Sequence, residues 1–258
     1  MRFGIISTNG LTFAVALVFA MLLTGCGLTD AKPWKETRRF YYTYVNTPVQ
    51  LDLTKPDGLG ELDSRLVTPL MSIDAELTSL ERTLAALAGL PNAVALQALA
   101  RDFPWLSSLV VLDAQAYVLN SHPPVSRKSL DYQVLLEVPE KTAARDLRYE
   151  VQDNPQGPEL MVARPFLKGV DLQYLLVATF DMRALLTYVR GGTDLMALTP
   201  HVLLWSGDRL YSDTLLADVD WMKELKSHSS GVLKSGKGNA VWLVRYLGYI
   251  PIVFVLAE

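Results

Sequence analysis

The longest regular pattern of apolar positions in the chain lies between residues 59 and 90. Apolar side chains recur there every three or four residues, and charged residues occupy positions between them. The apolar positions are Leu62, Leu66, Leu70, Ile73, Leu77, Leu80, Leu84 and Leu87. This spacing places them on one face of an α-helix, which Gly89 and Pro91 would end. Residues 59–91 are therefore predicted to form one helix, roughly 45 Å long at 1.5 Å per residue.

The apolar face of this helix needs a partner that removes it from water. One candidate is a set of sheets in the same chain, against which the face would form core. The other is a second copy of the helix, since apolar positions at this spacing also line the seams of coiled-coil dimers. The sequence leaves both alternatives open.

The rest of the chain shows strand patterns, and the order of its elements occurs twice. The first block, residues 92–192, is predicted to hold helices at 94–102 and 182–189, and strands at 108–112, 117–120, 147–152, 159–165 and 172–180. The second block, residues 193–258, is predicted to hold strands at 201–206, 209–212, 231–234, 240–247 and 250–257. In each block two strands, a helical insert and three strands follow one another. This repetition indicates two tandem antiparallel-sheet modules, so the predicted fold class is α+β.

The first 26 residues carry the pattern of an export signal. Residues 3–25 contain no Lys, Arg, Asp or Glu, and Arg2 precedes them. The apolar run is shorter than the roughly 20 residues of a membrane-spanning helix. It ends in Leu23-Thr24-Gly25-Cys26, which resembles the lipobox of bacterial lipoproteins. That resemblance implies that residues 1–25 are a signal peptide and that Cys26 is acylated. The alternative is an uncleaved signal anchor.

Residues 26–58 are predicted to be a lipidated tether with several prolines and no helical period. Basic residues near Cys26 suit either anionic lipid or solubility, and the aromatic segment 40–45 suits either a partner or packing on the domain. Acyl chains hold a protein on a bilayer without a spanning helix. We therefore expect a location in the cell envelope, facing the periplasm. Gly27 after the cysteine favours the outer membrane over the inner membrane.

Composition removes several classes of function. The net charge of −3 provides no electrostatic footprint for nucleic acid. A single cysteine excludes an intramolecular disulfide, and three scattered histidines predict no metal site. The chain has no Gly-x-Ser-x-Gly, no His-Glu-x-x-His and no phosphate-binding glycine loop. We therefore expect neither an enzyme nor a cofactor.

Three short sequences, in this order, resemble the extracellular double Cache sensor domain. They are LVVLDAQAYV at 109–118, VARPF at 162–166 and LVATFDM at 176–182. The resemblance covers roughly residues 59–258. It implies a long N-terminal helix packed along two PAS-like modules, with a ligand in the first module under its insert. The insert at 128–137 lacks the Arg-x-Trp motif of amino-acid-binding members, so the resemblance does not extend to that ligand.

Four polar residues are the candidates for ligand binding in the first module. Tyr132 lies on the insert, Arg148 and Arg164 lie on strands, and Asp181 follows the last strand. Arginine can hold a carboxylate through two parallel hydrogen bonds. Three of the four also have a structural alternative: a helix N-cap for Asp181, a salt bridge for Arg164 and a local ion pair for Arg148. Four tryptophans are expected in the core: Trp105, Trp205, Trp221 and Trp242.

Two functions fit these observations. The leading one is a lipid-anchored periplasmic binding protein of the sensor type, which binds a small organic molecule in the first module. Because the chain ends at Glu258 after its last expected strand, the bound state would pass to a separate envelope protein. The alternative is a structural adaptor lipoprotein that binds no small molecule and scaffolds an envelope complex.

Overall fold

The computed structural model describes residues 61–124, 128–137, 146–207, 214–235 and 238–257. All of them belong to one compact unit that comprises residues 52–258. The predicted signal peptide, Cys26, the tether and the strand expected at 209–212 lie outside the described residues. The predictions made for them therefore stay predictions.

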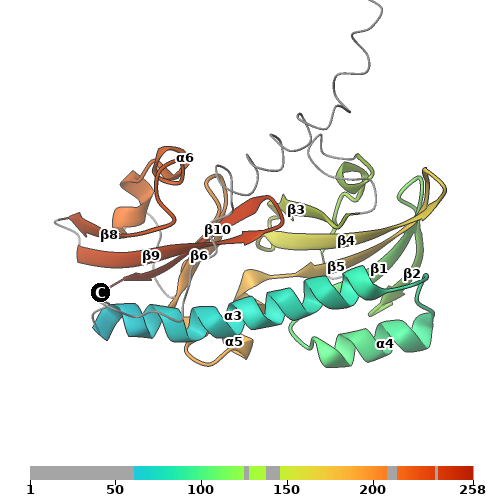
Figure 1. Ribbon diagram of the computed structural model, residues 1–258, viewed down its shortest axis with the longest axis horizontal. Helices are drawn as coiled ribbons and strands as arrows, with labels where there is room; N and C mark the ends of the chain where they lie inside the picture. Colours follow the sequence, from blue (N-terminus) through green and yellow to red (C-terminus); the bar gives the residue numbers. More distant parts are fainter. Residues whose placement is uncertain (1–60, 125–127, 138–145, 208–213, 236–237, 258) are drawn as a thin grey trace, which may run out of the picture. The chain divides into compact units, whose positions relative to one another are not determined.

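The long helix α3 extends from Glu61 to Ala86, so it ends three residues before Gly89. Leu66, Leu70, Ile73, Leu77, Leu80 and Leu84 are all at most 2% exposed. The helix (cyan in Figure 1) packs against strands of both sheets in its own chain. The apolar face is therefore intrachain core, and the alternative of a dimer seam is wrong for these six residues.

The first sheet contains five antiparallel strands in the spatial order β2-β1-β5-β4-β3. They are β1 (Ser108–Asp113), β2 (Val118–His122), β3 (Arg148–Gln152), β4 (Glu159–Lys168) and β5 (Asp171–Phe180). Helix α4 (Ala93–Asp102) precedes the sheet and α5 (Met182–Tyr188) follows it. The predicted strands and helices of this module are all present, with bounds shifted by up to three residues.

The second sheet repeats the same order, as β7-β6-β10-β9-β8. Its strands are β6 (Met196–Leu198), β7 (Leu203–Trp205), β8 (Ser230–Ser235), β9 (Gly238–Leu247) and β10 (Ile250–Ala257), with the short helix α6 (Trp221–Glu224) before β8. The strand expected at 201–206 is β7, the second strand of this sheet rather than the first. The first strand of this sheet is β6, which was not predicted. A strand of three residues is too short to show an alternation of apolar and polar positions. The α+β fold with a long helix and two antiparallel sheets is confirmed.

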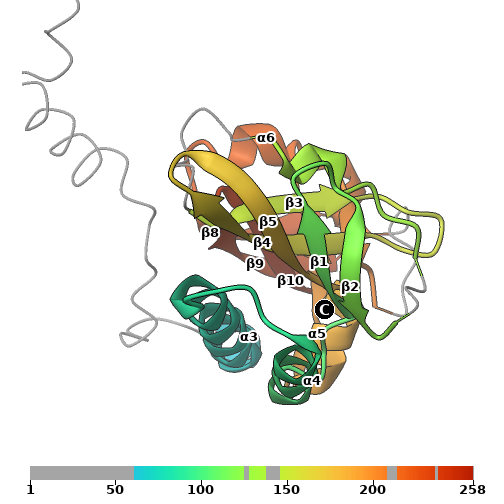
Figure 2. The same cartoon turned by 90° about the vertical axis from the view of Figure 1, so that its right-hand side faces the viewer.

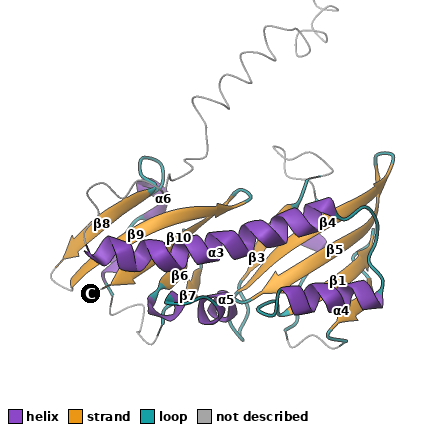
Figure 3. Ribbon diagram, turned by 60° about the horizontal axis from the view of Figure 1, so that its bottom comes forward, coloured by secondary structure: helices purple, strands orange, loops and turns teal. Residues whose placement is uncertain are grey.

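Each sheet has two different faces. Figure 2 shows α3 and α4 on one side of the sheets and α6 on the other. Figure 3, viewed from the helix side, shows α3 crossing strands of both sheets while α4 lies over β1. We call the side that carries α3 the helix face and the opposite side the covered face. Because strand residues alternate between faces, neighbours in a strand serve different layers.

Candidate functional site

A short segment of the first module, residues 128–137, covers part of its sheet. We call it the strap. It contains the single 3₁₀ turn η3 (Gln133–Leu135). Its side chains Leu130, Tyr132, Leu135 and Leu136 pack on an apolar cluster of the covered face. That cluster consists of Val110, Leu112, Met161, Ala163, Leu175 and Val177. The strap is therefore the lid of the first module's core.

Polar groups hold the strap along its length. The side chain of Gln152 exchanges two hydrogen bonds with the backbone of Asp131, at 2.8 and 2.7 Å. The Asn154 amide donates to the carbonyl of Ser129 at 2.9 Å. These contacts tie the strap to the end of β3 and the turn that follows it.

Arg148 fastens the other end of the strap. Its side chain lies on the covered face, since Arg148 pairs with Ala163 of the apolar cluster. Its Nη1 atom donates to the carbonyl oxygens of Leu135 and Leu136 at 2.5 and 2.9 Å. The residue is 3% exposed, and burial lowers the pKa of its guanidinium below the ordinary value. Two hydrogen bonds to the strap backbone therefore hold the guanidinium of Arg148.

Lys128 brings an ammonium group to the start of the strap. Its Nζ lies 2.6 Å from Glu159 Oε2 and 3.2 Å from Asp181 Oδ2. It also donates to the carbonyl oxygens of Gly157 and Pro158, at 3.0 and 3.4 Å. The side chain of Lys128 is 13% exposed and that of Glu159 is 1% exposed. The strap is thus anchored by a partly buried ammonium held between two carboxylates and two carbonyls.

Asp181 has two roles inside the chain. Its Oδ1 accepts the backbone N–H of Arg183 at 2.8 Å, so it is the N-cap of α5. Its Oδ2 pairs with Lys128 and lies 3.6 Å from Nη2 of Arg183. The predicted N-cap is present, and the same carboxylate also faces the strap anchor. Both of its oxygens are engaged in the described structure.

Tyr132 lies on the strap beside this cluster. It is half-buried against the apolar residues of the covered face. Burial, and after it the charge of Glu159, raises the pKa of its hydroxyl above the ordinary value of 10.0. Three of the predicted ligand-binding residues therefore meet at the strap. Tyr132 belongs to it, and Arg148 and Asp181 contact it.

Arg164 does not join these three. It follows Ala163 in β4, and Ala163 lies in the apolar cluster of the covered face. Alternation therefore places Arg164 on the helix face, on the far side of the sheet from Tyr132 and Arg148. Arg245 of the second module follows Val244 of that module's apolar cluster in the same way. Its side chain does reach α3, as described below.

Sequence reasoning missed Lys128 and Glu159. Glu159 could have been found, because it alternates in phase with Met161 and Ala163 and so is an acid on an apolar face. Nothing comparable identifies Lys128, since its two carboxylates are 31 and 53 residues away in the chain. Its position depends on how the strap returns over the sheet.

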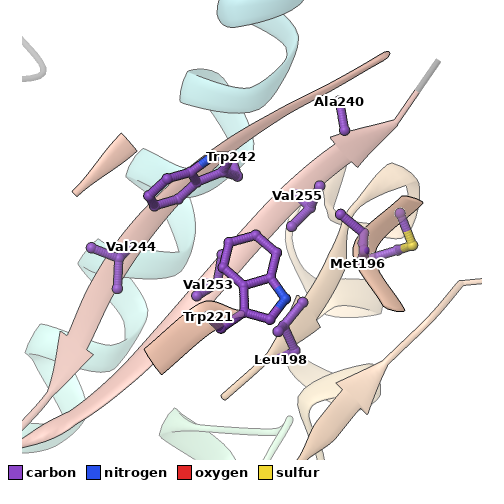
Figure 4. Close-up of a cluster of buried hydrophobic side chains, with 9 residues drawn as sticks. Met196, Leu198, Trp221, Ala240, Trp242, Val244, Val253 and Val255 are labelled. Carbon is purple, nitrogen blue, oxygen red and sulfur yellow. The ribbon is translucent and has the colours of Figure 1, made fainter. Parts of the chain in front are cut away.

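The second module fills its covered face differently. Trp221 of α6 and Trp242 of β9 meet edge to face, with ring centroids 5.4 Å apart. Figure 4 shows both rings among Met196, Leu198, Val253 and Val255. Both tryptophans are at most 3% exposed, and Trp105 is equally buried, as expected for core residues. The prediction is wrong for Trp205, which is only partly buried and has the guanidinium carbon of Arg183 5.9 Å from its ring centroid. The charged groups described above have no counterpart in this apolar cluster.

The geometry defines the class of the fold: an α+β architecture with one long helix packed along two five-stranded antiparallel sheets. No family model matches the chain, and no curated protein matches it. Among solved structures, the extracellular domain of a protein described as a histidine kinase is similar, with a TM-score of 0.50 and 13% identity over 73% of this chain and 88% of that one. A domain of a sensory box/GGDEF family protein from Vibrio parahaemolyticus has a TM-score of 0.49 at 12% identity, covering 77% of this chain and 97% of that one.

A third similar structure is the ligand-binding domain of the Pseudomonas aeruginosa amino acid chemoreceptor PctC, solved with GABA. Its TM-score is 0.42 and its identity 12%, over 76% of this chain and 93% of that one. Of these three domains, the histidine kinase domain has the highest TM-score. Among the described helices, none has both the length and the apolar character needed to cross a membrane.

Proposed function

We propose that this chain is a sensor-type binding protein of the bacterial cell envelope. In this proposal a small organic molecule binds between the strap and the first sheet, bordered by Tyr132, Arg148 and Asp181. The protein is held on a membrane by acyl chains on Cys26, and it passes its bound state to a separate envelope protein. The similarity in fold to the extracellular domain of a histidine kinase supports a sensory role outside the cytoplasm.

The burial of charge beneath the strap is the observation that carries this proposal. Arg148 and Glu159 are at most 3% exposed, and the side chain of Lys128 is 13% exposed. Burying charged groups costs free energy that an apolar interior of similar volume avoids. The second module covers its corresponding face with apolar side chains and two tryptophans. A site that must recognise a polar ligand gives a reason for that cost in the first module.

The adaptor remains the second candidate, and one observation favours it. Arg148, Lys128 and Asp181 each have partners within the chain. A ligand would therefore have to displace some of these internal contacts before it could bind. In an adaptor the same contacts would simply hold the module rigid.

A thermal-shift screen of the protein purified in detergent separates the two functions. The compounds are organic acids, primary amines, amino acids and purines. A ligand present at 100 times its dissociation constant should raise the free energy of unfolding by about 2.7 kcal/mol. Replacing Arg148 with methionine should abolish the shift, because it releases the strap that covers the site. The exposed Arg190→Met variant is the matched control and should keep it.

No shift with any compound class would favour the adaptor. A shift that survives Arg148→Met unchanged would place the ligand away from the strap, and so would contradict the proposed site while leaving a binding function intact.

The anchor has its own test. Cys26→Ser should move the protein from the membrane fraction to the soluble fraction, because the thiol that carries the acyl chains is gone. Fractionation with immunoblotting measures this, and mass spectrometry of the native protein should find an acylated N-terminal cysteine. Thr29→Ser, just outside the lipobox, is the control. Retention of the Cys26→Ser protein after a carbonate wash would rule out lipid anchoring.

A further inference from the structure

Two neighbouring residues of β3 contact different parts of the molecule. Arg148 lies on the covered face and holds the strap carbonyls. Tyr149, the next residue, points to the helix face because strand side chains alternate. Its hydroxyl donates to Glu81 Oε1 of α3 at 2.9 Å. A five-residue strand thus joins the strap on one side to the long helix on the other.

The carboxylate of Glu81 serves both modules. While Oε1 accepts from Tyr149 of the first sheet, Oε2 accepts from Nη2 of Arg245 in β9 of the second, at 2.9 Å. Arg245 also donates through Nε to Oδ1 of Asp74, about two helical turns before Glu81 in α3, at 3.1 Å. The side chain of Arg245 is 11% exposed and that of Glu81 is 21% exposed. One helix residue therefore bonds to both sheets in a partly buried setting.

The β9–β10 turn of the second module also rests on Tyr149. The Tyr249 hydroxyl donates to the backbone carbonyl of Tyr149, and the two rings meet edge to face with centroids 6.0 Å apart. Gly248 has a φ of +59°, and a Cβ built on it would lie 2.2 Å from the Tyr149 ring. The backbone of the turn is therefore in direct contact with that ring, and only glycine fits there.

The protonation state of Tyr149 suits this role. Burial raises the pKa of its hydroxyl well above the ordinary value of 10.0, and Glu81 raises it further through its charge and the hydrogen bond. The hydroxyl is therefore a neutral donor over the whole physiological range.

We propose that Tyr149, Glu81 and Arg245 form a coupling node that links the seating of the strap to the docking of the second module on α3. Strand β3 is the edge of the first sheet and is hydrogen-bonded to β4 alone among the strands described. It can therefore shift more easily than a central strand. When the strap is seated, Arg148 holds β3 in the register that lets Tyr149 reach Glu81 and the β9–β10 turn. When the strap lifts, β3 loses that restraint and the node loosens.

This inference rests on the proposed function, because a ligand beneath the strap is what would move the strap. A ligand shifts such an equilibrium only if it binds the seated and lifted states with different affinity. The coupling itself needs no ligand. The strap must affect the docking of the second module as strongly as that docking affects the strap. That property provides a test that does not depend on identifying the molecule.

Hydrogen–deuterium exchange of the full-length protein in detergent measures the coupling. Arg148→Met should speed exchange of the strap amides 129–136 by about tenfold or more, since it removes hydrogen bonds from a charged donor. If the node exists, the β9–β10 turn amides 247–250 should speed up in the same variant. Conversely, Tyr149→Phe, which removes only a hydroxyl, should speed exchange in the turn and also in the strap.

The controls separate coupling from general loosening. Tyr246→Phe changes an exposed tyrosine beside Arg245 and should leave both segments as in the wild type. Exchange of the central amides of β10 provides the reference for global unfolding in every variant. Glu81→Gln is a second node variant if Tyr149→Phe fails to fold, and it should give the same paired response.

An increase limited to the strap in Arg148→Met, and to the turn in Tyr149→Phe, would overturn the coupling node. A protein that binds no compound in the thermal-shift screen but shows the paired response would refute the binding function and keep the node. The two proposals therefore fail in different experiments.

Discussion

Replacing Lys128 with methionine should lower the free energy of unfolding by about 3–5 kcal/mol, the cost of breaking a buried ion pair by removing one partner. Methionine fills a similar volume but leaves the Glu159 carboxylate without its ammonium, in a position where that side chain is 1% exposed. The loss of the ammonium destabilises Asp181 less than Glu159, because Asp181 still accepts a hydrogen bond from the backbone N–H of Arg183. Urea unfolding followed by circular dichroism measures the change.

Two further variants show whether the loss comes from the buried charge. Lys168→Met removes an exposed lysine at the end of β4 and should change stability by less than about 0.5 kcal/mol. The double variant Lys128→Met with Glu159→Gln should recover much of the loss, because the uncompensated charge is gone. If Lys128→Met is as mild as Lys168→Met, the cluster does not anchor the strap.

Gly248→Ala is expected to cost about 2–5 kcal/mol. Roughly 1–2 kcal/mol comes from the left-handed conformation, which an L residue adopts at a penalty. Roughly 1–3 kcal/mol more comes from overpacking, because the new methyl group would lie 2.2 Å from the Tyr149 ring unless one of them moves. Thermal and urea unfolding of the variant measure the sum of the two effects.

Gly169→Ala isolates the conformational part. Gly169 has a φ of +68° in the β4–β5 turn, and nothing lies within 4 Å of a Cβ built there. Its variant should therefore lose only about 1–2 kcal/mol. Tyr149→Ala removes the ring. In that background Gly248→Ala should lower the free energy of unfolding by no more than Gly169→Ala does. Equal costs for the two glycine variants in the wild-type background would mean that the turn does not press on Tyr149.

The candidate site was partly accessible from the sequence. Tyr132, Arg148 and Asp181 were selected by residue type and by place in the order of elements, and all three border the strap. Arg164 was selected for the same reasons and lies on the other face. Side chains alternate along a strand, so Arg164 lies on the opposite face from Ala163. Arg148 is paired with Ala163 across β3 and β4, and it therefore lies on the face that Arg164 does not share.

The residues of the coupling node were outside the reach of sequence patterns. Arg245 is 164 residues from Glu81, and Tyr149 is 68 residues from it. Periodicity marks Glu81 only as a polar position on a helix, and Tyr149 only as a strand residue. Which two sheets meet that helix, and in what register, depends on packing between distant segments.

The amino-acid sequence by itself determined the long helix, the tandem order of strands and the α+β class. The buried face of α3 follows from apolar positions every three to four residues, and the strands follow from short apolar runs bounded by turn residues. Only the tertiary structure decided that the strap is anchored by Lys128 and Arg148, and that both modules share Glu81. Those contacts join groups far apart in the chain, and they form because the folded backbone brings charged side chains together where water is excluded.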